Sequence, residues 1–191
     1  MNKILILTII LTTFFNVSPC FATETGVESF ALDATEKGWS YFNHGDLETA
    51  LKRFHQATIL DPNFAPAYYG KAYIYSFQNR LKLAIENYRK AIDLAEQPYT
   101  SAYGNLGLAL LISGEDQEGF QMVQKALEID PHNGEAHNTL ANYYCSKKNS
   151  TLAWKHLEQA KESGLQPDPQ LIEEMKKECP NNPINPTEQA Q

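Results

Sequence analysis

Histidine is the residue type in this sequence that most often binds metals or transfers protons at neutral pH. The chain has five of them, at His44, His55, His132, His137 and His156. His132 and His137 are too far apart in the sequence for an HExxH motif, and no such motif occurs, so no two histidines are placed as zinc ligands on one helix face. His137 falls at a predicted packing position and the others fall at turns or on outward faces. We therefore expect no metal site.

Short motifs of the common catalytic sites are also missing from the sequence. There is no nucleophile elbow, no phosphate-binding glycine loop and no dinucleotide fingerprint. The acidic residues are numerous but scattered over positions that we predict to face solvent. These observations favour a protein that is not an enzyme and binds no cofactor.

Two cysteines, Cys145 and Cys179, are separated by one period of a sequence repeat that runs through the chain. They therefore occupy equivalent positions on adjacent helices. Neighbouring helix axes lie ~8–10 Å apart, whereas a disulfide needs Cα atoms at ~4.4–6.8 Å. A bridge is possible only if the last helix frays or tilts inward. The alternative, which the spacing favours, is two free thiols that are buried or half-buried.

The stretch from Gly38 to Pro62, GWSYFNHGDLETALKRFHQATILDP, sets the pattern that the rest of the chain repeats. Small and aromatic residues recur in it at helical spacing on two successive helices. Gly45 ends the first helix, Asp46 caps the second, and Pro62 cannot continue it. The pattern positions are Gly38, Tyr41, Ala50, Phe54 and Ala57.

The same pattern returns three times along the chain, at nearly constant intervals. This spacing resembles the tetratricopeptide repeat (TPR) family, whose period is about 34 residues. The resemblance implies an all-α fold, a right-handed α-solenoid of four helix-turn-helix repeats over 31–64, 65–98, 100–133 and 134–167. The expected helices are 31–44, 47–60, 65–78, 81–95, 100–113, 116–129, 134–147 and 150–163. The later pattern positions are Ala72, Tyr75, Ala84, Tyr88 and Ala91, then Gly107, Leu110, Gly119, Val123 and Ala126, then Ala141, Tyr144, Ala153, Leu157 and Ala160.

Residues 1–22 have the composition of a secretory signal peptide. Lys3 precedes an apolar run over 4–15, and a small-residue exit predicts cleavage after Ala22. The run is shorter than the ~20 residues of a spanning helix. An uncleaved signal, or a lipid on Cys20, is the lesser alternative, and membrane association is expected only through one of these. A polar lead-in over 23–30 follows, and we expect a periplasmic or secreted protein.

The C-terminal part closes the array. Residues 168–179 are predicted to form a capping helix, with Leu171, Ile172 and Met175 on its apolar side, because a stack of repeats must cover its last apolar face. Residues 180–191, with three prolines and no apolar period, predict a disordered tail. The formal net charge of -7, with no basic run, argues against a nucleic-acid partner and against binding to anionic lipid.

In the family that this chain resembles, the first helix of each repeat lines a surface that binds a peptide or helix of a partner. Carried over position by position, the resemblance implies an aromatic and aliphatic wall with a polar end. None of its positions is basic, so we predict that it does not capture a C-terminal carboxylate. The implied groove residues are Trp39, Phe42, Tyr69, Tyr73, Phe77, Leu108, Leu111, Asn138 and Asn142, with Thr35, Gly104, Ile112 and Cys145 beside them.

The function implied by the resemblance is that of an exported scaffold or adaptor. It would bind a protein or peptide partner in the groove, in the assembly of an envelope complex. One alternative is a periplasmic holding chaperone for unfolded export clients. Another is that the aromatic residues serve repeat packing, or are covered by the chain's own termini. The sequence indicates no oligomeric state.

Overall fold

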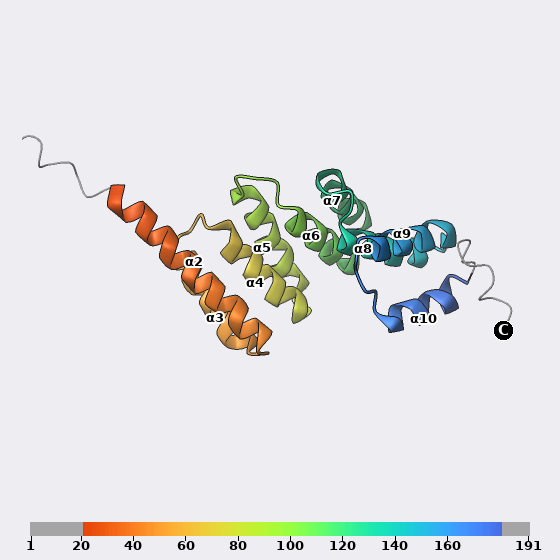
Figure 1. Ribbon diagram of the computed structural model, residues 1–191, viewed down its shortest axis with the longest axis horizontal. Helices are drawn as coiled ribbons and strands as arrows, with labels where there is room; N and C mark the ends of the chain where they lie inside the picture. The colour runs from red at the N-terminus through yellow and green to blue at the C-terminus, as the bar shows by residue number, and fades with distance from the viewer. Residues whose placement is uncertain (1–20, 181–191) are drawn as a thin grey trace, which may run out of the picture.

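The computed structural model describes residues 21–180, and within this range every regular element is an α-helix (Figure 1). The all-α prediction is therefore confirmed. The predicted signal peptide lies outside the described residues except for Phe21 and Ala22, as does the predicted tail beyond Pro180. The helices are α2 (Phe21–Asn43), α3 (Leu47–Leu60), α4 (Ala65–Phe77), α5 (Leu81–Leu94), α6 (Thr100–Ser113), α7 (Asp116–Ile129), α8 (Gly134–Ser146), α9 (Ser150–Glu162) and α10 (Pro169–Glu178).

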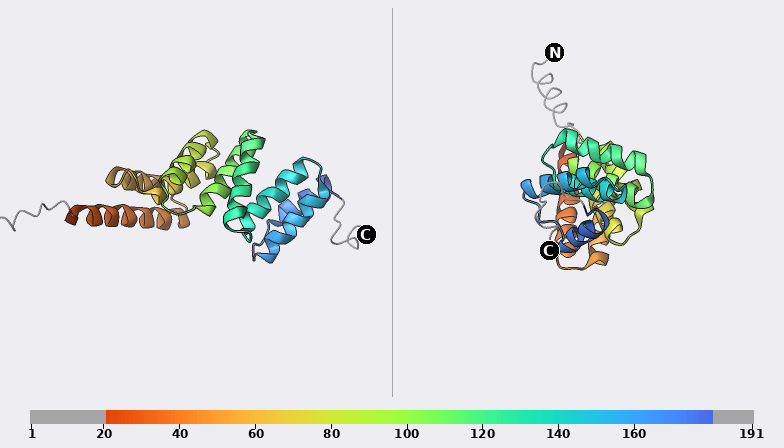
Figure 2. Two further views of the ribbon diagram at one scale, coloured as in Figure 1. Left: turned by 90° about the horizontal axis from the view of Figure 1, so that it is seen from above. Right: turned by 90° about the vertical axis from the view of Figure 1, so that its right-hand side faces the viewer.

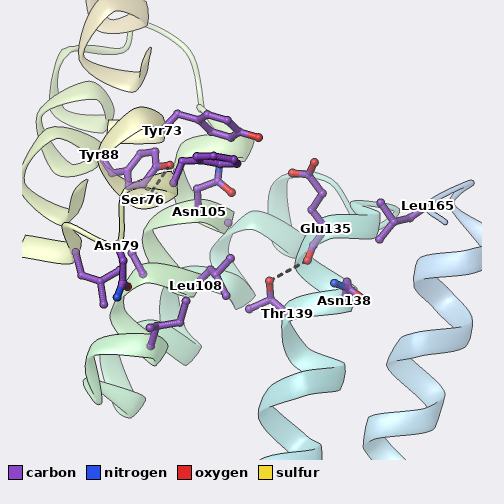
Figure 3. Close-up of a pocket in the computed structure, with 15 residues that line it drawn as sticks. Tyr73, Ser76, Asn79, Tyr88, Asn105, Leu108, Glu135, Asn138, Thr139 and Leu165 are labelled. Carbon is purple, nitrogen blue, oxygen red and sulfur yellow. Dashed lines mark hydrogen bonds between the residues drawn. The ribbon is translucent and has the colours of Figure 1, made fainter. Parts of the chain in front are cut away.

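Successive helices pair as α2/α3, α4/α5, α6/α7 and α8/α9, and the pairs are stacked along one axis (Figure 2). Side chains of α4, α6 and α8 surround a cavity (Figure 3). Within the described residues no helix is both long and apolar enough to cross a bilayer.

One boundary differs clearly from the prediction. The first helix begins at Phe21 and includes the predicted lead-in over 23–30. Residues 21–43 contain no proline, so nothing interrupts the backbone hydrogen bonds of α2 once the helix is nucleated by its packed half.

Local sequence explains where the helices begin and end. Gly45, Gly114 and Gly164 follow α2, α6 and α9 with φ angles of 80°, 88° and 90°, a left-handed conformation that glycine adopts without strain. Asp46 accepts a hydrogen bond from the Thr49 amide at 3.0 Å and so caps α3, as predicted.

Small residues let the helices approach one another closely. A Cβ atom added to Gly107 of α6 would lie 2.8 Å from the carbonyl oxygen of Gly119 in α7, and one added to Gly119 would lie 2.9 Å from the Gly107 carbonyl oxygen. The ring of Phe54, which has no exposed surface, occupies the space that a side chain at Gly38 or Gly70 would need. Phe54 thereby joins the first repeat to the second.

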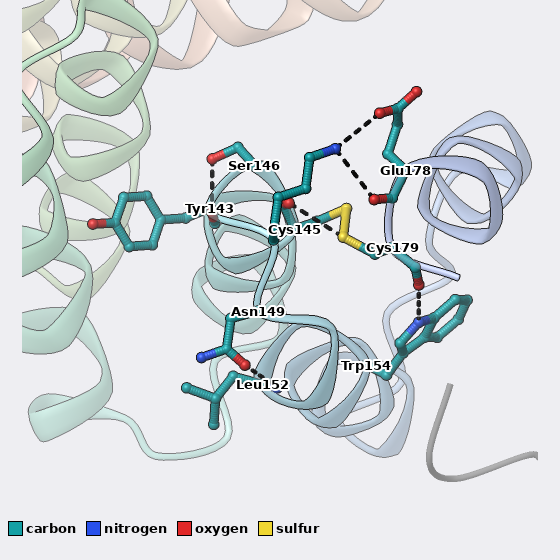
Figure 4. The surroundings of a disulfide bond; sticks show 9 residues. Tyr143, Cys145, Ser146, Asn149, Leu152, Trp154, Glu178 and Cys179 are labelled. Atoms are coloured by element: carbon teal, nitrogen blue, oxygen red, sulfur yellow. Dashed lines mark hydrogen bonds and ion pairs between the residues drawn. A yellow bond between two sulfur atoms is a disulfide. The ribbon is translucent and has the colours of Figure 1, made fainter. Parts of the chain in front are cut away.

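The last helix is fastened to α8 by a disulfide between Cys145 and Cys179 (Figure 4). The interpretation that both thiols are free is wrong. Cys179 lies one residue beyond α10 with φ -131° and ψ 61°, so its Cα can approach that of Cys145 to 5.7 Å, closer than two packed helices allow. Trp154 of α9 donates a hydrogen bond from Nε1 to the Cys179 carbonyl oxygen at 2.8 Å, and the side chain of Met175 on α10 is buried.

A pair of histidines joins α8 to α9. His137 Nε2 lies 3.0 Å from the Pro131 carbonyl oxygen, which can only accept, so Nε2 carries a proton and, in the neutral ring, Nδ1 is an acceptor. His156 Nδ1 must then donate to His137 Nδ1, at 3.0 Å. Burial, with smaller contributions from His137 and Lys155, lowers the pKa of His156 to about 4. His156 is therefore neutral at pH 7.

Removing the disulfide should weaken the C-terminal end of the array. The bridge joins cysteines with a sequence separation of 34, and replacing both Cys145 and Cys179 with alanine should cost roughly 3–4 kcal/mol of unfolding free energy from loop-closure entropy. Chemical denaturation measures this. Reduction should lower the midpoint of the wild type and leave that of the double variant unchanged. An equal response of both proteins would contradict the bridge.

A matched pair of glycine substitutions tests the close approach of α6 and α7. Gly107→Ala should cost about 1–3 kcal/mol, because the two backbones must separate. Gly104→Ala, on the same helix, places its Cβ at an ordinary 3.9 Å from Ala126 Cβ and should be neutral or stabilise by about 0.5–1 kcal/mol. Thermal unfolding of both variants measures the difference. Equal midpoints would mean that α6 and α7 are not packed this closely.

Acid should destabilise the protein through His156. Because its folded pKa lies below the unfolded value of 6.5, the unfolded chain binds more protons between about pH 6.5 and pH 4, so stability is lost as the pH falls through this window. His156 is half-exposed, so solvent screening reduces the loss to about 1–2 kcal/mol. Denaturation at pH 7 and pH 4.5 should show a smaller acid loss for His156→Gln. Parallel losses in both proteins would refute the lowered pKa of His156.

Candidate functional site

A cavity of about 360 Å³ lies among α4, α5, α6 and α8. Phe77, Leu108 and Ile112 form its apolar wall, and their side chains are 68%, 39% and 58% exposed. Polar side chains of α6 and α8, Asn105, Asn138 and Thr139, also line it (Figure 3). We call this cavity and its wall the groove.

Four of the nine groove residues implied by the resemblance line this cavity. They are Tyr73, Phe77, Leu108 and Asn138. Gly104 and Ile112, expected beside them, line it as well.

Trp39 and Phe42 lie instead in an aromatic cluster between the first two repeats. The Trp39 ring centroid is 5.0 Å from that of Phe54 and 5.5 Å from that of Tyr73. Phe42 contacts Tyr73 and Phe77 edge-on, at 5.3 Å and 5.9 Å. Edge-to-face contacts of this kind stabilise the cluster beyond the area buried. The cluster supports the groove from one end, because Tyr73 and Phe77 belong to both.

Tyr69 packs between the second and third repeats. Its hydroxyl oxygen accepts a hydrogen bond from Asn105 Nδ2 at 3.0 Å, and its ring lies 4.9 Å from that of Tyr99. Burial raises the pKa of the Tyr69 phenol well above its ordinary value, and it raises the pKa of Tyr99 to about 12. Both phenols are therefore neutral at physiological pH and serve as packing and hydrogen-bonding groups.

Two further implied residues, Leu111 and Asn142, also lie outside the cavity. Leu111 packs with Val123 and Ala126 of α7, on the other side of α6. Asn142 is exposed one turn further along α8 and donates a hydrogen bond from Nδ2 to the Asn138 carbonyl oxygen at 3.1 Å. Of the flanking residues, Thr35 is buried and Cys145 forms the disulfide.

The cavity also contains residues that sequence reasoning missed, and Glu135 is the one that matters for chemistry. It lies about one helical turn before Asn138 and Thr139, so the three side chains share one face of α8. The helical spacing of Glu135, Asn138 and Thr139 is the sequence signal from which Glu135 could have been predicted to line the groove. Within the described residues no group of three or more His, Cys, Asp or Glu side chains could share a metal ion. What the groove offers is an apolar wall, hydrogen-bonding amides and one carboxylate.

Comparison with known proteins identifies the repeats. A family model described as "Tetratricopeptide repeat" matches residues 65–98 and 100–133, and a second with the same description matches residues 122–161. The first two ranges coincide with the second and third predicted repeats. Together the matched ranges cover half of the chain.

Curated relatives are similar over their repeats. "DnaJ homolog subfamily C member 3" of Bos taurus is 30% identical over 112 residues, which are 59% of this chain and 22% of that protein. "Tetratricopeptide repeat protein 36" of Danio rerio is 30% identical over 124 residues, 63% of this chain and 66% of that protein. The chain thus spans about a fifth of the first relative's length.

Solved structures of similar fold include MamA, with a TM-score of 0.61 and 25% identity over 70% of this chain and 78% of that one. The first TPR of Spaghetti (RPAP3), bound to the HSP90 peptide SRMEEVD, has a TM-score of 0.59 and 26% identity over 63% of this chain and 97% of that one. Pseudomonas aeruginosa pilF has a TM-score of 0.68 and 22% identity over 80% and 69%, a likeness of fold alone. With its regular sequence period, paired helices and matched ranges, the chain belongs to the tetratricopeptide repeat family.

Proposed function

We propose that this protein is an exported, non-enzymatic scaffold that holds a segment of a partner protein in the groove. The observation that supports this best is the exposure of Phe77, Leu108 and Ile112 on one wall of one cavity. Water contact with three large apolar side chains is unfavourable, and a patch of this kind is typical of a surface that binds another molecule.

The dimensions of the groove favour a peptide or helix over a folded domain. A volume of about 360 Å³ accommodates a few side chains. The first TPR of Spaghetti (RPAP3) is bound to a short HSP90 peptide, and it shares the fold of this chain. We extend this peptide-binding mode to the groove here.

Export is the second part of the proposal. It rests on the charged start, apolar run and small-residue exit of residues 1–22. The Cys145–Cys179 disulfide supports it, because structural disulfides persist in oxidising compartments such as the periplasm and are rare in the cytosol. On the basis of this location and of the family resemblance, we propose that the scaffold serves the assembly of an envelope complex.

Site-specific crosslinking in the native cell tests the proposal. A photo-reactive amino acid at Ile112 should crosslink to one or two partner proteins, because that side chain projects from the groove wall. The same group at Ile59 of α3 is the matched control, since Ile59 is similarly exposed, at 67%, but lies outside the groove. Equal crosslinking from both positions would contradict a groove-specific partner.

A groove variant completes the test. Leu108→Asp combined with Ile112→Asp should abolish the crosslinks made from a reporter at Phe77 and leave helicity unchanged, because the native side chains at 108 and 112 are exposed. Retained crosslinks would place the binding surface elsewhere. Crosslinks to a broad set of unfolded proteins would instead indicate the holding chaperone.

A further inference from the structure

The first helices of the second, third and fourth repeats, which we call the inner helices, have almost no charged side chains. Across α4, α6 and α8 the charged residues are Lys71 and Glu135. Lys71 lies in a different cavity, between α4 and α5, with its ammonium 5.3 Å from the ring centroid of Tyr68. Glu135 is therefore the one charged side chain among the residues that line the groove.

Glu135 lies in the first turn of α8 with its carboxylate over the groove (Figure 3). Its backbone carbonyl accepts a hydrogen bond from Thr139 Oγ1 at 2.9 Å, whereas its exposed carboxylate forms no ion pair with any residue that the structure describes. The charge of Glu135 also acts on Tyr88, another residue that lines the groove. Burial is the main cause that raises the pKa of the Tyr88 phenol, and the negative charge of Glu135 adds to the rise.

A second acceptor lies one turn further along the same face. The Oδ1 atom of Asn138 is buried and has no hydrogen-bond partner among the described residues. Leaving a buried acceptor unpaired costs free energy, and a small rotation of the side chain toward a donor in the groove would recover it. The α8 rim of the groove thus carries acceptors and a negative charge, while the wall formed by Phe77, Leu108 and Ile112 is apolar.

A ligand that suits both sides must combine apolar side chains with a hydrogen-bond donor of positive charge. Lysine and arginine have this character, because they pair an apolar stem with a cationic donor. An acidic ligand would meet the Glu135 carboxylate with no basic residue in the lining to compensate it. The chain's own residues 181–191 do not suit the site, since they contain Glu188 and no lysine or arginine.

We propose that the groove selects a cationic amphipathic segment of its partner, with apolar side chains against Phe77, Leu108 and Ile112 and a lysine or arginine on Glu135. This inference rests on the proposed function, because it names the chemistry of the segment that the groove holds. The proposed segment is positively charged, and so has the opposite charge to a peptide that ends in acidic residues.

Synthetic peptides of matched design test the charge preference. A set of fluorescent peptides of equal length would share leucines at helical spacing and differ at one position, which is Lys, Arg, Gln or Glu. Binding to the purified mature protein is measured by fluorescence polarisation at low and physiological salt. We expect the Lys and Arg peptides to bind about fivefold or more tightly than the Glu peptide, as for a partly exposed ion pair.

Three variants assign the preference to its residue. Glu135→Gln should make the four peptides nearly equal, and Glu135→Lys should reverse their order. Glu162→Lys is the control, since Glu162 is exposed on α9 outside the groove and the substitution changes the net charge equally. This control is essential because the negative net charge of the protein, -7 over the full sequence, attracts any cationic peptide.

The outcomes separate this inference from the proposed function. Binding of all four peptides with equal affinity would overturn the charge preference and leave the apolar groove in place. A preference lost equally in Glu162→Lys and Glu135→Lys would also overturn it, because the cause would then be net charge. Binding of none of the peptides would count against the groove itself. Binding that appears only after residues 181–191 are removed would assign the groove to the chain's own tail.

Discussion

Close contact between helix backbones is the constraint on which the rest of this structure depends. Where α6 crosses α7, Gly107 and Gly119 leave no room for a Cβ atom on either helix. Glycine also permits close packing between repeats, because the Phe54 ring fills the space left by Gly38 and Gly70. Contacts this close fix the distance and angle between neighbouring helices, because van der Waals repulsion rises steeply when atoms approach further. The row of inner helices that results gives the groove its shape.

The groove is the part of this row where packing is incomplete. On the faces of α4 and α6 that pack against other helices, residues such as Ala72, Leu106 and Leu110 are buried. On the groove face, Phe77, Leu108 and Ile112 remain exposed beside a single carboxylate, that of Glu135. The C-terminal end of the stack, by contrast, is covered by α10, which is held in place by the disulfide and by the hydrogen bond from Trp154. The molecule thus covers its end and leaves its groove open.

Much of the fold could be predicted from the sequence, because small and aromatic residues at fixed spacing determine which helix faces meet. The groove was predicted less well. A repeat position identifies the face of a helix but not the depth of a side chain, so Trp39, Tyr69 and Leu111 were assigned to the groove although they pack within or between repeats. Glu135 was missed because an acidic residue in the first turn of a helix is favourable for the helix alone. The disulfide depended on the backbone of Cys179 leaving the helix, which spacing does not reveal.

Hydrogen exchange of the protein purified with its native partner would test the central claim most directly. The account predicts that partner binding slows exchange in the groove segments, the C-terminal half of α4, the middle of α6 and the first turns of α8. Exchange in the outer helices α3, α7 and α9, none of which contributes a residue to the groove lining, should change little. Slowed exchange confined to those outer helices, with the groove segments unaffected, would contradict the claim that the groove holds the partner.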